Sequence, residues 1–273
     1  EMEDGGFTVV KYKKTRQHIR TCRQHRISVS EDNDALENTD VNRTAIINRL
    51  NEAILLLESS AYCSNLKKMI SAMLQGDGTL CDVMEMVLYG VGNFSSCPIA
   101  RYQLALYTIL HRDCNVPPNK CFIYDPKFSD VEFDVLKELG YCIIEENEEG
   151  KRETSCPTLF YMPHCGKVLY NNLLWKNWNS RQLTDIMILG NSFSNMNDSL
   201  PKKEFTDHYS YIQRILPYTA ELKVENNFDH VDIFNDTSLH YFKENVLNSI
   251  PREFWLKNSE PIVSDDVEII LKK

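Results

Sequence analysis

The chain has 273 residues, 42% of them hydrophobic and 25% charged, with ten Gly and ten Pro, a composition that is typical of a folded protein and excludes disorder as the dominant state. Its most apolar stretch, from Ile46 to Leu57, is interrupted by polar side chains and is too short for a membrane span, so we expect no membrane contact. A net charge of −9 argues against a folded domain that binds nucleic acid.

Residues 1–40 have an uneven charge distribution. The stretch from Lys11 to Arg26 holds seven basic residues and no acidic one, whereas residues 28–40 are acid-rich and contain no base. We interpret them as a flexible basic arm and an acidic linker; the alternative for the arm is a contact with nucleic acid, a nuclear-import receptor or an acidic partner. The first residues lack the pattern of a signal peptide, so we expect a cytosolic or nuclear protein.

Residues 41–80 read as a pair of amphipathic helices. Ile46, Leu50, Ile54 and Leu57 fall three or four positions apart, and a second such pattern runs from Leu66 to Leu74. The glycine-containing cluster at 75–79 is expected to end the pair.

From residue 81 to 273 short apolar runs alternate with helical stretches. The predicted strands are 83–89, 120–124, 141–145, 158–162, 185–189 and 220–224, with an edge strand at 231–234. The predicted helices are 98–111, 131–139, 167–178 and 204–216, with a closing helix at 238–250. This alternation predicts an α/β fold: a Rossmann-like, doubly wound, mostly parallel sheet with an amino-terminal helical pair.

Ligands bind such sheets at the carboxyl ends of the strands, and the loop after the first strand has features of a binding loop. Gly90 and Gly92 permit a tight turn, Asn93 and Ser95 follow, and a helix begins near Pro98, which favours an anion or nucleotide site. The loop departs from a nucleotide fingerprint at Ser95, and Phe94 stands where a methyltransferase-like loop would have Gly. A tight turn kept for packing is the alternative.

Later strand ends add polar groups to the same edge. Asp125 follows the second strand, where Rossmann-type folds hold a ribose-binding acid; alternatively it starts a turn before a Ser129–Glu132 capping box. His164 follows the fourth strand, and Asn191 and Ser192 follow the fifth. We interpret the acid-rich segment 145–152 as a solvated connection. No nucleophile, base and acid can be assembled into a catalytic set, and no metal-ligand spacing stands out.

The nine cysteines lack a C-x-x-C pair, which argues against a zinc ribbon or a disulfide scaffold. Cys97 and Cys156 each precede a proline and, with His164, are the candidate haem ligands. Cys97 has the better physical case, because a helix amino end favours the thiolate. The alternative is a cap or loop cysteine. Trp175 and Trp178 are expected to face the core.

Taken together, the strand-end segments closely resemble the sensitivity-to-red-light-reduced domain family. The matching segments, in chain order, are GVGNFSS (90–96), RYQLA (101–105), DPKF (125–128), NEEGKR (147–152), FYMPH (160–164), LYNNLLW (169–175) and GNSF (190–193). The resemblance implies a regulatory protein, tied to clock and light signalling in plant members and to haem biosynthesis and clock-gene expression in animal ones. It implies no reaction and no catalytic residues.

Three functional hypotheses follow. The first is a regulatory protein of clock output and haem biosynthesis that binds a nucleotide-like ligand or haem in its cleft and works with protein partners. The second is an enzyme similar to S-adenosylmethionine-dependent methyltransferases, with Gly90 and Gly92 beside the cofactor, Asp125 on its ribose and His164 near the transferred group. The third is a protein-interaction module without a small ligand.

Overall fold

The structure is a computed structural model that describes residues 32–75 and 83–262. The predicted basic arm and most of the predicted turn at 75–79 lie outside the described residues. Within the described part no helix combines the length and apolar character needed to cross a membrane.

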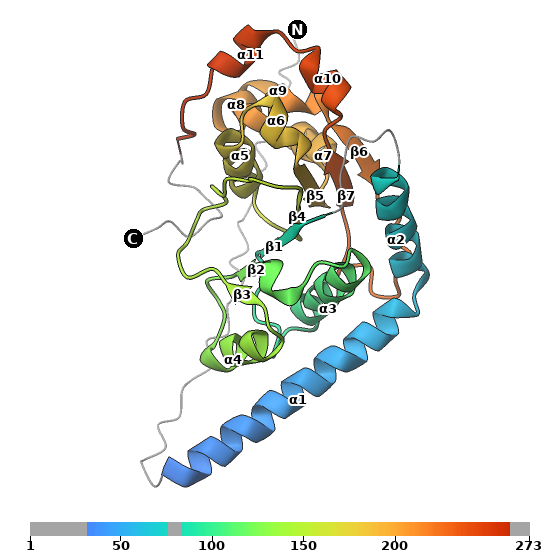
Figure 1. The fold of residues 1–273 in the computed structure, drawn as a ribbon, viewed down its shortest axis with the longest axis vertical. Coiled ribbons are helices and arrows are strands. Elements are labelled where there is room, and N and C mark those ends of the chain that lie inside the picture. Colours follow the sequence, from blue (N-terminus) through green and yellow to red (C-terminus); the bar gives the residue numbers. More distant parts are fainter. Residues whose placement is uncertain (1–31, 76–82, 263–273) are drawn as a thin grey trace, which may run out of the picture.

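A seven-stranded sheet forms the centre of the molecule (Figure 1). Its order is β3-β2-β1-β4-β5-β7-β6, and the first five of these strands are parallel, whereas β7 runs antiparallel to both β5 and β6. The strands are β1 (Glu85–Tyr89), β2 (Cys121–Tyr124), β3 (Cys142–Ile143), β4 (Thr158–Met162), β5 (Ile186–Asn191), β6 (Ala220–Lys223) and β7 (Thr237–Tyr241). The predicted doubly wound, mostly parallel α/β fold is confirmed.

Helices cover both faces of this sheet, which explains why its central strands are continuous apolar runs. They are α1 (Asp32–Glu58), α2 (Ala61–Leu74), α3 (Pro98–Asp113), α4 (Asp130–Glu138), α5 (Lys167–Lys176), α6 (Ser180–Thr184), α7 (Phe193–Asp198), α8 (Lys202–His208), α9 (Ser210–Ile215), α10 (Glu244–Asn248) and α11 (Arg252–Leu256), with short 3₁₀ turns at Pro118–Lys120 and Leu216–Tyr218. All five residues of β4 are buried.

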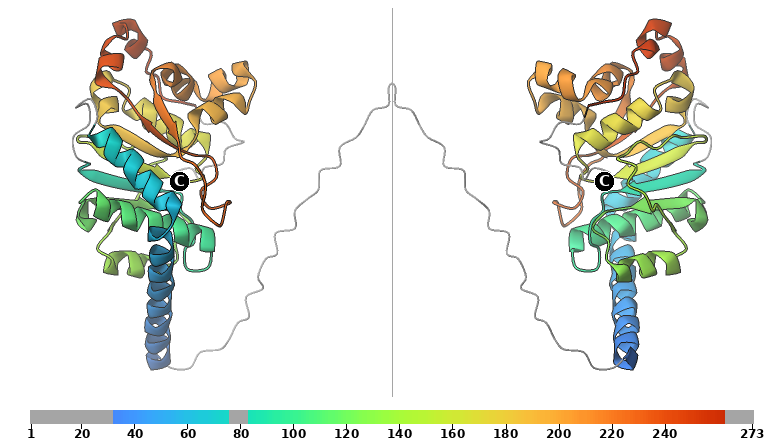
Figure 2. Two further views of the ribbon diagram at one scale, coloured as in Figure 1. Left: turned by 90° about the vertical axis from the view of Figure 1, so that its right-hand side faces the viewer. Right: turned by 90° about the vertical axis from the view of Figure 1, so that its left-hand side faces the viewer.

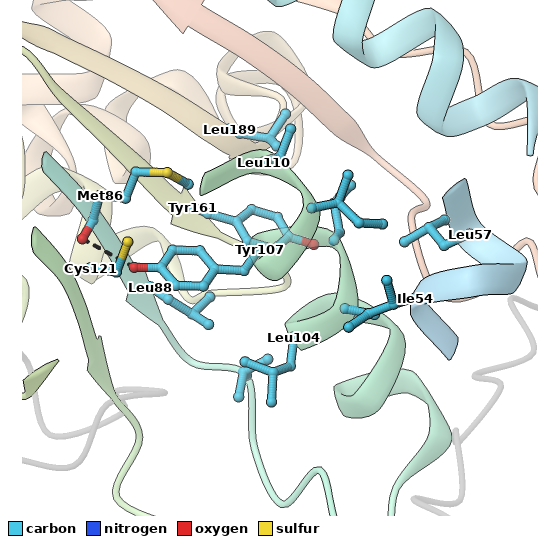
Figure 3. Packing of buried hydrophobic residues seen from close by; sticks show 14 of the residues in the cluster. Ile54, Leu57, Met86, Leu88, Leu104, Tyr107, Leu110, Cys121, Tyr161 and Leu189 are labelled. Carbon is cyan, nitrogen blue, oxygen red and sulfur yellow. Dashed lines mark hydrogen bonds between the residues drawn. The ribbon is translucent and has the colours of Figure 1, made fainter. Parts of the chain in front are cut away.

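Two hydrophobic clusters lie on opposite faces of the sheet, and alternate residues of each strand enter one or the other. Leu159 and Tyr161 of β4 join the cluster that contains α1, α2 and α3, whereas Phe160 joins the cluster around α5 and α9. In the first cluster the Tyr107 hydroxyl donates to the main-chain oxygen of Met86 (3.1 Å; Figure 3). The same hydroxyl lies 3.2 Å from the main-chain oxygen of Phe122. The tyrosine of α3 thereby fixes the helix across β1 and β2.

The predicted helical pair is present as α1 and α2. α1 packs against α3 and α4 and buries Leu50, Ile54 and Leu57, and Ser60 caps α2 by accepting a hydrogen bond from Cys63 N (3.1 Å). However, α1 begins at Asp32, so residues 32–40, predicted as a linker, are helical. The amino-terminal part of α1 extends beyond the body of the molecule (Figure 2). The sequence prediction missed this part of the helix because residues 32–40 are acid-rich and show no helical repeat of apolar residues.

The carboxyl-terminal elements differ most from the sequence prediction. Residues 231–234 form a turn instead of an edge strand, and the predicted helix 238–250 is replaced by β7 followed by α10. The helix predicted at 204–216 is broken at Tyr209, whose φ of −128° and ψ of 44° are not helical. The strand predicted at 141–145 is reduced to β3. β7 was missed because its polar residues Ser238 and His240, both buried, hide the strand pattern.

Candidate functional site

A cavity of about 510 Å³ opens at the carboxyl ends of β1, β2 and β4. β1 and β4 are neighbours in the sheet although β2 and β3 separate them in the chain, so the connections diverge here and leave a crevice. This first cavity is lined by Tyr89, Gly90, Gly92, Tyr124, Asp125, Pro126, Lys127, Asn147, Glu149, Gly150, His164, Cys165, Gly166 and Leu169. Four of the eight residues predicted to bind a ligand, Gly90, Gly92, Asp125 and His164, therefore meet in one place.

The loop after β1, residues 90–97, depends on two glycines with left-handed backbone. Gly90 has φ +73° and Gly92 has φ +77°. A β-carbon at position 90 would lie 2.6 Å from Cys165 Sγ, so Gly90 lets this loop approach the loop that follows β4. A β-carbon at position 92 would meet no atom within 4 Å. Gly90 is thus required for packing, and Gly92 leaves space at the cavity.

Two buried carboxylates hold this loop in place. Asp125 Oδ2 accepts a hydrogen bond from Gly92 N (2.7 Å), and its Oδ1 accepts one from Lys127 N (2.8 Å). Glu132, which is fully buried, accepts from Ser95 N (2.7 Å) and from the backbone and hydroxyl of Ser129 (both 2.9 Å), so the predicted capping box is confirmed. The amides of Gly92 and Ser95 are bonded to carboxylates and are not available to a phosphate group.

The two remaining candidate ligand-binding residues of this loop, Asn93 and Ser95, form hydrogen bonds within the protein. Asn93 Oδ1 accepts hydrogen bonds from the Ser95 hydroxyl (2.9 Å), Ser96 N (3.0 Å) and the Ser96 hydroxyl (2.6 Å). Cys97 N donates to the main-chain oxygen of Asn93 (3.0 Å) at the start of α3. Neither Asn93 nor Ser95 is among the residues that line the first cavity. The tight turn kept for packing is therefore the better description of residues 93–97.

The segment 145–152 forms the opposite wall of the cavity, which makes the interpretation as a solvated connection wrong. Asn172 Nδ2 donates to the main-chain oxygen of Glu149 (2.8 Å), and a β-carbon on Gly150 would lie 2.6 Å from Leu169 O. Glu148 accepts a short hydrogen bond from the Tyr89 hydroxyl and pairs with Arg152 at 2.8 Å. Burial, followed by the charge of Glu148, raises the pKa of Tyr89, which stays a neutral hydrogen-bond donor.

The loop after β4 carries His164, an exposed residue with φ +54°, a conformation that non-glycine residues seldom adopt. Its Nδ1 lies 3.5 Å from Gln103 Nε2, and the same amide nitrogen donates to Ile233 O (3.2 Å). Because Gln103 Nε2 is a donor, His164 Nδ1 accepts, and the neutral ring then carries its proton on Nε2. The next residue, Cys165, donates to Tyr89 O (3.3 Å), and burial raises the pKa of its thiol.

A second cavity of about 600 Å³ adjoins the first across His164 and Cys165. It is also lined by Lys167, Asn191, Asn195, Met196, Ser199 and Asp236. The carboxylate of Asp236, a residue with φ +53°, accepts hydrogen bonds from the amides of Asn191 (3.4 Å) and Asn195 (2.5 Å). Asn191 thus belongs to the second cavity, whereas Ser192 caps α7 and donates to Glu221. Among the described residues, three of the four non-glycine positions with positive φ line these two cavities.

The three candidate haem ligands do not converge. Cys97 is the N-cap residue of α3 and packs against the core cluster, whereas Cys156 precedes β4 at the opposite edge of the sheet, near Glu85 and Lys120. Only His164 lines a described cavity. Trp178 is buried and Trp175 packs against the same cluster, as expected. Nowhere in residues 32–75 and 83–262 do three or more His, Cys, Asp or Glu side chains gather in an arrangement that could hold a metal ion.

The sequence missed Tyr89, Tyr124, Lys127, Asn147, Glu149, Gly150 and Leu169 as cavity residues. Gly150 was the available signal, since a glycine within an acid-rich turn indicates a backbone that approaches another segment closely.

Comparison with known proteins identifies this chain's relatives. The family model described as the SRR1 domain matches residues 63–241. The SRR1-like protein of Mus musculus is 47% identical over 133 residues, which cover 48% of this chain and 53% of that protein. The SRR1-like protein of Drosophila melanogaster is 30% identical over 95% of this chain and 91% of its own length. Protein SENSITIVITY TO RED LIGHT REDUCED 1 of Arabidopsis thaliana is 32% identical over 62% of each chain. The matches thus span less than two thirds of the mouse and plant proteins.

Proposed function

The chain belongs to the SRR1 family, and on that premise we propose that it is a regulatory protein that binds a small adenosine-containing ligand in the first cavity. The printed name of the plant relative connects that protein with sensitivity to red light. A role in light and clock signalling, in regulation of haem biosynthesis and in complexes with protein partners in the cytosol or nucleus belongs to this proposal. The geometry of the protein supports the ligand; the biological setting comes from the family.

The observation that carries the ligand proposal is the position of the first cavity in the sheet. It lies where β1 and β4 are adjacent and is bordered by the glycine loop, by Asp125 and by His164. Doubly wound, mostly parallel sheets of this kind bind nucleotide-like cofactors at such a switch point. This likeness is a fold-level analogy, and binding is supported by the cavity itself.

The charges and hydrogen bonds of the cavity favour an uncharged or cationic ligand over a polyphosphate. Asp125 and Glu149 are the acids that line it, and Lys127 is the one lysine among its lining residues. The Gly92 amide, which would meet a phosphate in a nucleotide-binding loop, already donates to Asp125. S-adenosylmethionine and S-adenosylhomocysteine contain a nucleoside but no phosphate. Among the candidate cofactors they therefore fit better than ATP or NAD.

Asp125 supports binding mainly by shaping the loop. Its two oxygens each accept a backbone N–H, and this holds Gly92 at the cavity. A carboxylate oxygen can accept more than one hydrogen bond, so the predicted contact with ribose hydroxyls remains part of the proposal.

Methyl transfer is the second candidate function, and the junction of the two cavities favours it. A donor in the first cavity and an acceptor in the second would meet at His164 and Cys165, which line both. Transfer of a labelled methyl group from S-adenosylmethionine to protein in a cell extract, compared between wild type and His164→Ala, tests this function. Equal labelling by the two proteins would argue against it.

Ligand binding is tested by thermal denaturation of the full chain with S-adenosylmethionine, S-adenosylhomocysteine, ATP, NAD or haem. A ligand present at 100 times its dissociation constant adds about 2.7 kcal/mol to the free energy of unfolding. We expect stabilisation by the first two compounds, its loss in Asp125→Asn, and its retention in Asp185→Asn, a matched change beside the amino end of β5. Stabilisation by ATP or NAD equal to that by the S-adenosyl compounds would contradict the charge argument. No stabilisation by any compound at millimolar concentration would favour the interaction-module hypothesis.

A further inference from the structure

After α11 the chain descends along the side of α5 in an extended conformation (Figure 1). Residues 257–260, which we call the tail segment, are all exposed. Three consecutive main-chain oxygens of this segment accept hydrogen bonds from side chains. Arg214 Nη1 donates to Lys257 O (2.7 Å), Trp175 Nε1 to Asn258 O (3.1 Å) and the Tyr211 hydroxyl to Ser259 O (2.7 Å). The tail segment is therefore held through its backbone.

Two of the three donors, Arg214 and Tyr211, are held by aromatic packing outside the tail segment. The Arg214 guanidinium carbon lies 4.5 Å from the ring centroid of Trp178 and 4.9 Å from that of Phe254, and the group also donates to Phe254 O. Tyr211 packs edge-on against Trp178 with centroids 4.8 Å apart. Stacking limits the rotamers of these side chains, so little conformational freedom is lost when an extended chain docks.

The tail segment ends at an ion pair with the wall of the first cavity. Lys151 Nζ lies 2.8 Å from Glu260 Oε1 and 2.8 Å from Glu149 Oε2. Glu149 has φ +52° and lines the cavity together with Asn147 and Gly150. One lysine thus joins the tail segment to the strained turn that closes one side of the cavity.

We propose that Trp175, Tyr211 and Arg214 form a docking surface that recognises an extended polypeptide through its carbonyl oxygens, and that the tail segment occupies it as an intramolecular regulator. Glu260 then acts as a latch on segment 145–152. An exposed segment held by a few peripheral contacts opens locally without global unfolding. Release of the tail segment loosens the cavity wall, and a ligand that orders this wall favours the docked tail, because coupling between two sites is reciprocal. The coupling does not depend on which ligand the cavity accepts.

Docking of the tail segment is tested by trypsin cleavage of the Lys257–Asn258 bond in the full chain, followed by the mass of the carboxyl-terminal fragment. Trypsin cleaves this bond only after the tail segment has left the docking surface. The double variant Trp175→Phe, Tyr211→Phe removes two donors and keeps two aromatic rings, and we expect cleavage about 5- to 30-fold faster than in wild type. The control is Tyr218→Phe, which removes a hydroxyl from a ring that also packs on Phe254. Equal cleavage rates in the double variant and the control would overturn the proposed docking of the tail segment.

The latch is tested by hydrogen exchange of the backbone amides of residues 147–152, with no ligand present. We expect Glu260→Gln to accelerate exchange there by up to about fivefold, the range of a partly exposed ion pair. The control is Glu253→Gln, an exposed acid of α11. Unchanged exchange in Glu260→Gln, or equal acceleration in the control, would overturn the latch. Neither readout involves S-adenosyl compounds, so failure of the proposed function leaves both results interpretable.

Discussion

Replacement of Gly90 by alanine tests how closely the loops after β1 and β4 approach each other. The new methyl group would lie 2.6 Å from Cys165 Sγ at a residue whose φ is +73°. The left-handed backbone costs about 1–2 kcal/mol for a residue with a β-carbon. The steric overlap costs about 1–3 kcal/mol more, because Cys165 must leave the position from which it donates to Tyr89 O. We therefore expect Gly90→Ala to lower the free energy of unfolding by about 2–5 kcal/mol.

The contribution of the overlap can be separated in a double-mutant cycle. In the Cys165→Ala protein the sulfur is absent, so Gly90→Ala should cost only the backbone term of about 1–2 kcal/mol. The difference between the two backgrounds, about 1–3 kcal/mol, is the coupling energy, measured by urea unfolding of the four proteins. Gly92→Ala is the control, since it has a similar φ of +77° and no atom within 4 Å of the added β-carbon. The same cost of Gly90→Ala in both backgrounds would refute the reasoning.

Three further predictions concern buried or half-buried polar groups. Burial raises the pKa of Glu221, but the adjacent His240 ring, whose Nε2 lies 3.6 Å from Oε1, and hydrogen bonds from Ser192 and Ser194 outweigh it and lower the pKa from 4.5 to about 2. Unfolding measured between pH 2 and 7 should therefore show stability lost as the pH falls from about 4.5 toward 2. Glu221→Gln should flatten this acid limb, and an unchanged pH profile would contradict the assignment. Glu132→Ala should lower the free energy of unfolding by about 3 kcal/mol in urea, since it leaves the half-buried Ser95 amide and the α4 cap without an acceptor. A loss under about 1 kcal/mol would show that water replaces the carboxylate. Asn177→Asp should cost about 2–4 kcal/mol by the same assay, because the fully buried amide donates to two carbonyl oxygens that a carboxylate would repel; full stability would mean that the acid is protonated.

Where local pattern and tertiary environment agree, the sequence was a sufficient guide. β4 has the predicted bounds, because a five-residue segment with four consecutive apolar residues, buried on both faces of the sheet, has no competing arrangement. The capping box of Ser129 and Glu132 also forms as expected, since its donors and acceptors lie within one helical turn. The sequence did not predict the bond of the second Glu132 oxygen, which accepts from Ser95 N, 37 residues away.

The errors arise where contacts distant in the sequence decide the structure. β7 pairs with β5 and β6 on its two sides, and its buried His240 stacks on Phe193 at 4.1 Å, an environment that a single-chain pattern does not reveal. Segment 145–152 contains six charged residues, which predict a solvated turn, yet Asn172 and Leu169 of α5 fix it against the cavity. The sequence predicts that Asn93 and Ser95 bind a ligand, but Asn93 accepts from the Ser95 hydroxyl and Ser95 N donates to Glu132, so both residues bond within the protein.

By itself the sequence determined the fold class, the positions of the parallel strands along the chain and the edge of the sheet at which polar groups gather. These follow from hydrophobic period and from the rule that parallel strands end at a common edge. The tertiary structure alone decided which of those groups share a cavity. It paired Gly90 with Cys165, satisfied the loop amides with Asp125 and Glu132, and brought Glu260 to Lys151. The physical reason is that hydrogen bonds, steric fit and ion pairs depend on distances of a few ångströms between segments that lie far apart in the sequence.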